Sequence, residues 1–337
     1  MRLLAVFAAA VVACAMASDD ALAAPWCGST TTEDRRAADP GHAIRVVYAL
    51  AADRAERSAH HAPRISADVD EIAAWWRGQD AGREPRFDRV GFPCGMQADI
   101  VVVRLGESAA ALRADATRFE LIANAVLTGS GQNEKHLVYY DGPVEDRSVC
   151  GEGGGTATGD GVAIVYLGAC PDVPSAVVAA HELLHALGAM ELGAPHACPD
   201  TPEHPCDSKR DLLSPALAPV NLDAFELDSG RDDYYAHQGA WVDVQQSPWL
   251  RSVTGHISLG LVVTGRGGIL GAGPACRTVR CARGVPSQLA RTLRATPASG
   301  WRFAGWSGAC RGRAATCTVA VTTATAVRAR FVRRAGR

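Results

Sequence analysis

Two histidines and a glutamate are spaced for metal chemistry in the stretch His181-Glu182-Leu183-Leu184-His185. On a helix, residues four apart lie one turn apart on the same face, so the two imidazoles can take neighbouring corners of one zinc tetrahedron. The Glu182 carboxylate then lies near the metal without ligating it, where it can take a proton from a zinc-bound water that attacks a carbonyl. The pattern predicts a zinc peptidase in which His181 and His185 bind the metal and Glu182 is the general base.

The residues around this stretch predict the helix that the chemistry needs. Pro174 suits the first turn of a helix and Gly188 suits its end, so a helix is expected over residues 174–188. The apolar run 162–167 precedes it and is typical of a buried strand. The competing interpretation is a chance occurrence of the pattern on a core helix. The strand and helix signals together favour the metal site.

A catalytic zinc also needs a third protein ligand and an open position for water. The candidates after Gly188 are Glu191, His196, His204 and Asp207. At this point the chain resembles the metzincin clan of zinc metallopeptidases. In that clan the two-histidine helix continues through a glycine to a third histidine and then to a methionine-containing turn. Glu191 occupies the third-histidine position here, so the simple pattern fails at that residue.

A longer loop restores the resemblance. His204 is followed by the segment 211–215, Asp-Leu-Leu-Ser-Pro, which resembles the turn after the third histidine of the clan. The resemblance implies His204 as the third zinc ligand, with His196 as the alternative and the two acidic candidates behind them. Leu212 or Leu213 replaces the methionine, which is a swap of similar volume at a position that packs rather than ligates.

The resemblance extends over roughly residues 40–250 and implies an arrangement for the substrate. It implies a cleft between a sheet-bearing upper half and a small lower half, with an extended peptide lying along an edge strand. It also implies that a tyrosine after the turn, Tyr234 or Tyr235, stabilises the oxyanion. The alternative is that both rings pack inside a polar loop.

The other elements of this part predict an α+β fold. Apolar runs predict strands, and apolar residues at helical spacing predict two further helices. The strands are expected at 44–50, 100–105, 137–140 and 162–167, and the helices at 66–77 and 108–127. This order indicates a metzincin-like mixed twisted sheet with the active-site helix, backed by helices. The Gly-rich stretch 151–161 is expected to form a surface loop at the rim of the cleft, and His60-His61 to lie in a polar loop.

The amino-acid pattern changes near the end of the chain. Residues 255–331 consist of short Val, Thr and Leu runs punctuated by Gly and Pro, which predict a small all-β module. This tail resembles the divergent internalin-B-type repeat of bacterial surface proteins, an accessory module. The matching residues are Ala295-Thr296-Pro297, the run 301–310, Cys317-Thr318-Val319 and the run 327–331. The expected organisation is a signal peptide at 1–23, a catalytic domain at 24–250 and a basic all-β domain at 251–337.

Charge is distributed unevenly along the chain. The net charge is only −2, yet residues 251–337 hold 15 arginines and no Asp, Glu or Lys. The preceding residues carry 19 basic and 36 acidic side chains, a net charge of −17. Such asymmetry is typical of a surface that meets an anionic partner, such as a wall polymer, lipid headgroups or nucleic acid. An arginine-biased genome would explain the arginines but not the missing acids.

The N-terminus and the cysteines predict an exported protein. Arg2 precedes an apolar run that ends in a small-x-small cleavage signal, Ala21-Leu22-Ala23. Alternatively Cys14 completes a lipobox-like site and carries a lipid anchor. No later stretch is long and apolar enough to span a membrane. The ten cysteines after the signal predict five disulfides: Cys27–Cys94, Cys150–Cys170, Cys198–Cys206, Cys276–Cys281 and Cys310–Cys317.

These signals together predict a secreted or extracytoplasmic zinc metalloendopeptidase that acts on a protein or peptide substrate. The basic domain is expected to meet an anionic cell-envelope polymer, with no specific nucleic-acid partner. The alternative is a non-catalytic surface or wall-binding protein whose peptidase-like domain has lost its activity. An intact Glu182 and a bound metal distinguish the two hypotheses.

Overall fold

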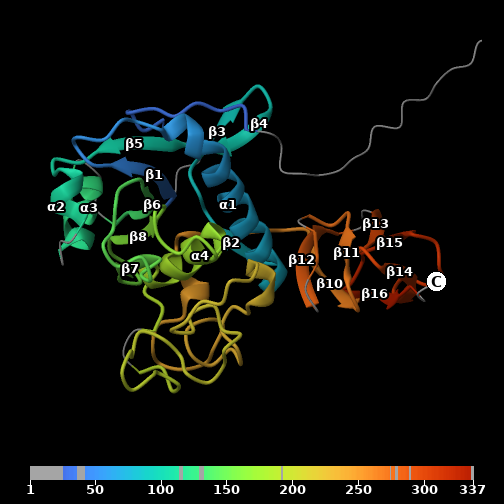
Figure 1. Ribbon diagram of the computed structural model, residues 1–337. Coiled ribbons are helices and arrows are strands. Elements are labelled where there is room, and N and C mark those ends of the chain that lie inside the picture. The colour runs from blue at the N-terminus through green and yellow to red at the C-terminus, as the bar shows by residue number, and fades with distance from the viewer. Residues whose placement is uncertain are drawn as a thin grey trace, which may run out of the picture.

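The computed structural model describes residues 26–35, 42–113, 117–128, 133–190, 193–273, 275–277, 280–287 and 290–334. The predicted export signal, the lipobox cysteine Cys14 and the ligand candidate Glu191 lie outside these residues. The described chain forms an α+β unit followed by an all-β unit, as predicted (Figure 1).

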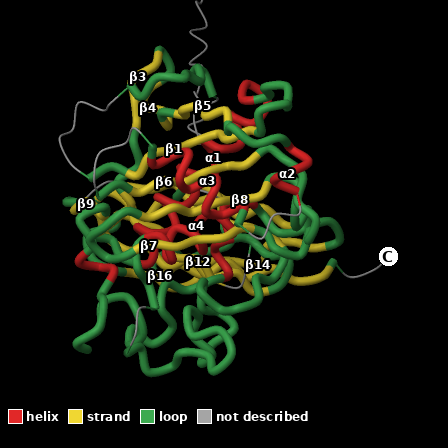
Figure 2. The backbone as a smooth tube through the Cα atoms, turned by 90° about the vertical axis from the view of Figure 1, so that its left-hand side faces the viewer, coloured by secondary structure: helices red, strands yellow, loops and turns green. Residues whose placement is uncertain are grey.

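A five-stranded mixed sheet forms the centre of the first unit. Its strands follow in the order β5 (Ile100–Arg104), β1 (Ile44–Leu50), β6 (Lys135–Tyr140), β8 (Gly161–Tyr166) and β7 (Gly151–Gly155), as Figure 2 shows. The first four strands are parallel to one another, and β7 pairs antiparallel with β8 at the edge. The apolar runs that predict strands are confirmed in β1, β5, β6 and β8. Strands buried on both faces need such continuous apolar sequences.

Helices cover both faces of this sheet (Figure 1). They are α1 (Ser58–Gln79), α2 (Ala109–Arg113), α3 (Arg118–Leu127) and α4 (Ser175–Ala186). Alternate residues of β1 enter the two cores: Val46 and Tyr48 pack with α1 and α4, whereas Val47 and Ala49 pack with α2 and α3. Because strand side chains alternate between the two faces, α4 packs on the face that carries Val46 and Tyr48.

Two local expectations are corrected by the structure. The Gly-rich stretch is not wholly a loop, because its first five residues form the edge strand β7. His60 and His61 lie inside α1, which begins eight residues before the expected start at Ser66. The predicted helix 108–127 appears as two described helices, α2 and α3.

The segment from residue 193 to 249 has little regular structure. It contains two short 3₁₀ helices, η1 (Leu222–Ala224) and η2 (Val244–Gln246), and lies below the sheet in Figure 1. Many backbone amides of this segment donate hydrogen bonds to side chains instead of to other backbone groups. The carboxylate of Asp228, which is buried, accepts hydrogen bonds from the backbone amides of residues 232–235 at distances from 2.6 to 3.3 Å.

Two sheets around a separate core make up the second unit. The four-stranded sheet has the order β12 (Arg280–Pro286), β10 (His256–Thr264), β16 (Thr325–Arg333) and β14 (Trp301–Gly308). The three-stranded sheet has the order β11 (Gly267–Leu270), β13 (Ala290–Pro297) and β15 (Thr316–Ala320). Inward residues such as Leu261, Val327 and Phe331 are buried between them, which confirms the predicted all-β module.

The two units contact each other along α1. A Cβ added to Gly78 would lie 2.2 Å from the carbonyl oxygen of Ala282, so glycine is required for this close approach. The guanidinium of Arg283 is 2 % exposed and forms an ion pair with Asp223 of η1. Arg251 of β9 (Leu250–Ser252) pairs with the buried carboxylate of Glu84 in β2 (Arg83–Pro85).

Five disulfides form, and they are the predicted pairs: Cys27–Cys94, Cys150–Cys170, Cys198–Cys206, Cys276–Cys281 and Cys310–Cys317. Disulfides persist in oxidising compartments, so they indicate an extracytoplasmic environment. In the described part of the chain, no helix combines the length and the apolarity that crossing a bilayer requires.

Candidate active site

Helix α4 places three of the predicted site residues. His181, Glu182 and His185 are all less than 9 % exposed, and their side chains line one cleft. The edge strand β7 lies directly against this turn of the helix. A Cβ on Gly151 would come within 2.8 Å of Glu182 Cγ, and one on Gly153 within 2.5 Å of the Glu182 carbonyl oxygen. The glycines of β7 are therefore needed for the helix and the edge strand to approach.

A disulfide-closed loop brings the third predicted ligand to α4. The amide of Cys198 donates to the carbonyl of His204, and the amide of Cys206 donates to the carbonyl of His196, across the Cys198–Cys206 bridge. This small hairpin places His204 Nε2 3.3 Å from His181 Nε2. His185 Nε2 lies 3.2 Å from the same His181 atom. The three imidazoles therefore converge on one point.

A hydrogen bond of the His181 ring leaves its lone pair at the point of convergence. His181 Nδ1 donates to the carbonyl oxygen of Leu212 at 2.7 Å, which leaves its Nε2 without a proton. Burial lowers the pKa of His181 to about 4. Burial also lowers the pKa of His185 well below its ordinary value and, to a smaller extent, that of His204. Neutral imidazoles are the form that binds metal, and converging lone pairs favour a cation between them.

The spacing of the three nitrogens fits zinc. A tetrahedron with metal–nitrogen bonds of about 2.0–2.1 Å has corners about 3.3–3.4 Å apart. The two nitrogen–nitrogen distances to His181 are 3.2 and 3.3 Å. Possible ligand atoms of all three histidines lie within 4.8 Å of one another. Three nitrogen donors would leave a fourth position of the tetrahedron for water or substrate.

Glu182 has the environment of a proton acceptor that can also return the proton. Burial raises the pKa of Glu182 to about 8, and the nearby Glu152 carboxylate adds to the rise. Because that pKa lies near neutrality, the carboxyl group can exist in both protonation states during a reaction at physiological pH. A cation held by the three histidines would favour the charged form and shift this pKa downwards.

A cleft of about 680 Å³ opens in front of these four side chains. Its walls come from the start of α3, from residues 148–153 leading into β7, and from residues 215–217 below the helix. Volumes of this size are typical of substrate sites. The edge strand β7 and residues 215–217 thus both line the same cleft.

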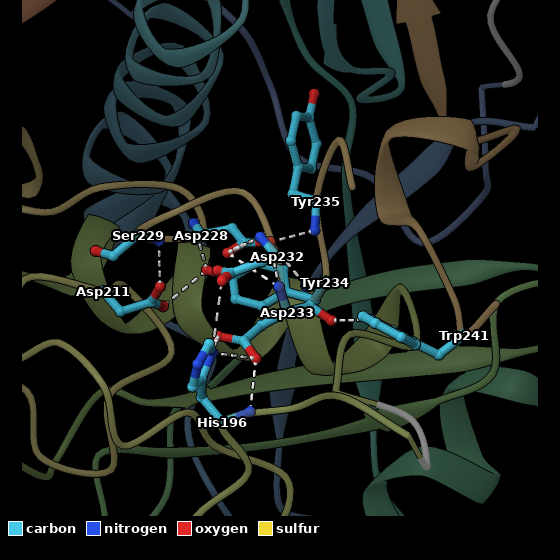
Figure 3. Close-up of polar contacts among 9 residues, drawn as sticks. All are labelled: His196, Asp211, Asp228, Ser229, Asp232, Asp233, Tyr234, Tyr235 and Trp241. Carbon is cyan, nitrogen blue, oxygen red and sulfur yellow. Dashed lines mark hydrogen bonds and ion pairs between the residues drawn. The ribbon is translucent and has the colours of Figure 1, made fainter. Parts of the chain in front are cut away.

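The structure does not bring the alternative ligand His196 to this point. Its backbone amide and its Nδ1 contact Asp233 at 2.9 and 3.1 Å, in a separate cluster (Figure 3). Asp207 lies in that cluster as well, together with Asp232. Of the four sequence candidates for the third ligand, His204 is the one that joins His181 and His185 among the described residues.

Neither tyrosine proposed for the oxyanion lines the cleft. Tyr234 and Tyr235 are fully buried. The hydroxyl of Tyr234 donates to Asp211 (Figure 3). The hydroxyl of Tyr235 donates to Asp80 and accepts from Trp76. The structure therefore shows packed rings with satisfied hydroxyls, which is the alternative interpretation.

The structure also shows a supporting network that sequence patterns missed. The buried Asp211 carboxylate accepts hydrogen bonds from the Ser229 amide and the Tyr234 hydroxyl (Figure 3). It also accepts one from the Leu213 amide. These bonds fix the turn whose Leu212 carbonyl orients the His181 ring. The two leucines at the methionine position are fully buried, so they pack as expected. The spacing between Asp211 and Tyr234 offers no sequence signal for this contact.

Replacing Tyr234 by phenylalanine is expected to lower the free energy of unfolding by about 2 kcal/mol, because the Asp228 amide loses its acceptor and the buried Asp211 carboxylate loses one of its three donors. The hydroxyl accepts from the Asp228 amide as well as donating to Asp211. Urea unfolding followed by tryptophan fluorescence measures the change. Tyr140→Phe is the matched control, since the buried Tyr140 hydroxyl has no hydrogen-bond partner among the described residues. Equal losses in both variants would contradict this role of Tyr234.

Replacing both Cys198 and Cys206 by serine is expected to lower the free energy of unfolding by roughly 2.5 kcal/mol, the chain-entropy value for so short a loop. Amide hydrogen exchange over residues 196–206 should also become faster, because the bridge holds the hairpin that carries His204. The control is the serine pair at Cys276 and Cys281, which close a similarly short loop in the other unit. Faster exchange at 196–206 in the control would contradict a local effect.

Comparisons with known proteins bear mainly on the tail. Among the solved structures that match is OgpA from Akkermansia muciniphila, at 11 % sequence identity and a TM-score of 0.33, with 93 % of this chain and 88 % of that chain covered. A similarity this weak supports no inference about the present site. No curated protein sequence matches the chain. Residues 284–335 match the family model of the divergent InlB B-repeat domain, which confirms the predicted C-terminal repeat.

Proposed function

We propose that this protein is a zinc-dependent metalloendopeptidase acting outside the cytoplasm. Its main support is the convergence of three imidazole nitrogens, from His181, His185 and His204, beside the buried carboxylate of Glu182. This arrangement lies at the floor of a substrate-sized cleft. Imidazole nitrogens that converge on one point, with no carboxylate between them, fit metal binding better than core packing.

Each residue has a distinct task in the proposed reaction. His181, His185 and His204 would hold zinc through Nε2, and the Leu212 carbonyl would fix the ring of His181. Bound zinc supplies Lewis-acid chemistry: it makes water more acidic and polarises the scissile carbonyl. Glu182 would accept the proton of the attacking water and transfer it to the leaving amine. Burial raises the pKa of Glu182, which makes its carboxylate a stronger base for the first of these transfers.

The peptidase proposal is tested by incubating the purified chain with an unfolded, disulfide-free protein and identifying new termini by mass spectrometry. We expect internal cleavage that a zinc chelator abolishes and that added zinc restores. Cleavage that persists at full strength after the metal has been removed would contradict the proposal. Cleavage by a contaminating protease is excluded by the same assay on the Glu182→Gln variant.

A second function, binding to an anionic polymer of the cell envelope, is favoured by the outer face of the four-stranded sheet. Arg302, Arg328 and Arg330 are exposed on this face, on the neighbouring strands β14 and β16. They have no carboxylate partner in the described part of the chain. Arginines in a row on one face of a sheet match closely spaced negative groups on a linear polyanion.

Replacing Arg302, Arg328 and Arg330 together by glutamine is expected to weaken binding to a linear polyanion at least about tenfold, since each basic residue near an anionic surface contributes about 1 kcal/mol. Retention of the full chain on dextran sulfate, compared with uncharged dextran, measures this change. Arg251→Gln is the control, because Arg251 is already paired with Glu84. Equal retention of the triple variant and the parent would contradict the assignment of this face.

A further inference from the structure

We infer that the cleft selects peptides carrying a lysine or arginine side chain close to the scissile bond, with Glu120 as the residue that recognises it. This inference rests on the proposed peptidase function and adds a substrate class to it. It is drawn from the charges that line the cleft, from the partners of each carboxylate, and from the aromatic ring beside Glu120.

The charged side chains around the cleft are of one sign. Besides Glu182, the lining includes Glu120 at the start of α3, Glu152 on β7 and Glu203 beside the third histidine. No lysine or arginine lines the cleft among the described residues. Three histidines line it too, and their Nε2 atoms converge on the proposed metal position rather than on the outer part of the cleft. Glu120, Glu152 and Glu203 lie outside the proposed ligand set, so they would keep the outer part of the cleft anionic with zinc bound.

The three outer carboxylates differ in their existing partners. The hydroxyl of Tyr166 donates to Glu152, and Arg118 Nη2 lies 3.6 Å from the same carboxylate. Glu203 Oε1 lies 3.4 Å from His204 Nδ1, on the side of the ring away from the other two histidines. Glu120 is exposed and has no ion-pair partner among the described residues. It is therefore the carboxylate that remains open to a substrate cation.

The neighbour of Glu120 can receive the apolar stem of a basic side chain. The ring of Phe119 also lines the cleft and packs on Gly154, where an added Cβ would lie 3.4 Å from Phe119 Cζ. Lysine and arginine have long apolar stems that lie along apolar surfaces while the charged head reaches polar groups. An aromatic face also attracts the cation itself. Phe119 and Glu120 together thus match the two parts of such a side chain, and an aliphatic or acidic side chain would match only one or neither.

The expected preference is moderate, because Glu120 is exposed to solvent. Exposed ion pairs in proteins are weak, and an aromatic contact beside them adds to the effect, so we expect a roughly five- to tenfold higher kcat/KM for a basic residue than for an uncharged one of similar size. Salt screens such pairs, so the preference should shrink between about 0.05 M and about 0.5 M ionic strength.

The test uses the full zinc-loaded chain and a pair of peptides that differ only by lysine against glutamine near the bond that is cut. The cleavage sites that supply this sequence are first mapped by mass spectrometry in an unfolded protein. We expect basic residues to be enriched near these sites and the lysine-to-glutamine ratio of kcat/KM to be about five or more. In Glu120→Gln this ratio should fall towards one, whereas Glu120→Asp should retain part of it. Glu145→Gln, an exposed glutamate outside the cleft, is the control and should keep the parent ratio.

The outcomes separate the inference from the function on which it rests. Zinc-dependent cleavage without enrichment of basic residues, or with a ratio that Glu120→Gln leaves unchanged, would overturn the selectivity and leave the peptidase proposal standing. Failure of the zinc-loaded chain to cleave any unfolded protein or peptide would overturn both. Enrichment that survives in Glu120→Gln but disappears in Glu203→Gln would overturn the assignment to Glu120.

Discussion

Replacing Glu182 by glutamine is expected to lower kcat for peptide hydrolysis by about 10³-fold, within the range that a positioned general base contributes. Glutamine has nearly the same shape and cannot accept the proton of the attacking water. Glu182 is adjacent to His181 in sequence but is not one of the three converging nitrogen donors, so the bound zinc should stay at one ion per chain. Turnover of an unfolded protein and metal content by elemental analysis, on the same sample, measure both quantities.

Two results would contradict this role of Glu182. If zinc were lost together with activity, the carboxylate would be a ligand or a structural support rather than a base. If activity were retained, the proton would be taken by another group. Glu145→Gln is the control, because it removes an exposed glutamate outside the cleft and should leave both turnover and metal content unchanged.

Replacing His204 by alanine is expected to lower zinc affinity by more than about 100-fold, since the loss of a direct ligand exceeds the loss of a group that only orients one. The two remaining donors, His181 and His185, cannot hold the metal in a three-ligand catalytic site. Peptide hydrolysis should fall in parallel and should recover in part at high zinc concentration. Competition with a fluorescent zinc chelator measures the affinity.

His196→Ala is the matched comparison, because it removes a histidine from the same disulfide-closed hairpin. The structure places His196 against Asp233 and away from the other histidines, so zinc affinity should change little. The expected cost is about 1 kcal/mol of stability from the lost side-chain hydrogen bond. Loss of zinc in His196→Ala, with zinc retained in His204→Ala, would reverse the assignment of the third ligand.

The central helix and the parallel strands could be predicted from sequence because their signals are local. The run 162–167 is apolar at every position, as a strand buried on both faces requires. His181 and His185 share a face through the helical period alone. The disulfide pairs followed from the spacing and the even number of cysteines, and all five form.

The features that sequence did not predict depend on tertiary contacts. The glycines of β7 carry no strand signal, and they form an edge strand because α4 packs where side chains would otherwise lie. The lower segment is shaped by the carboxylates of Asp211 and Asp228, which bind backbone amides far outside any helical or strand period. His196 lies two residues before Cys198 and His204 two residues before Cys206. The spacing therefore did not show which of the two histidines is the third ligand. In the folded hairpin, His204 is the histidine that points towards His181.

The most direct measurement is a zinc titration of the metal-free chain in which bound metal and peptide hydrolysis are followed together. The proposed site predicts that activity is absent without metal, rises in proportion to bound zinc, and saturates at one ion per chain, with His204→Ala failing to saturate over the same range. Full activity in the metal-free chain, or tight binding of one zinc ion in the variants lacking His181, His185 or His204, would contradict a catalytic zinc held by these three histidines.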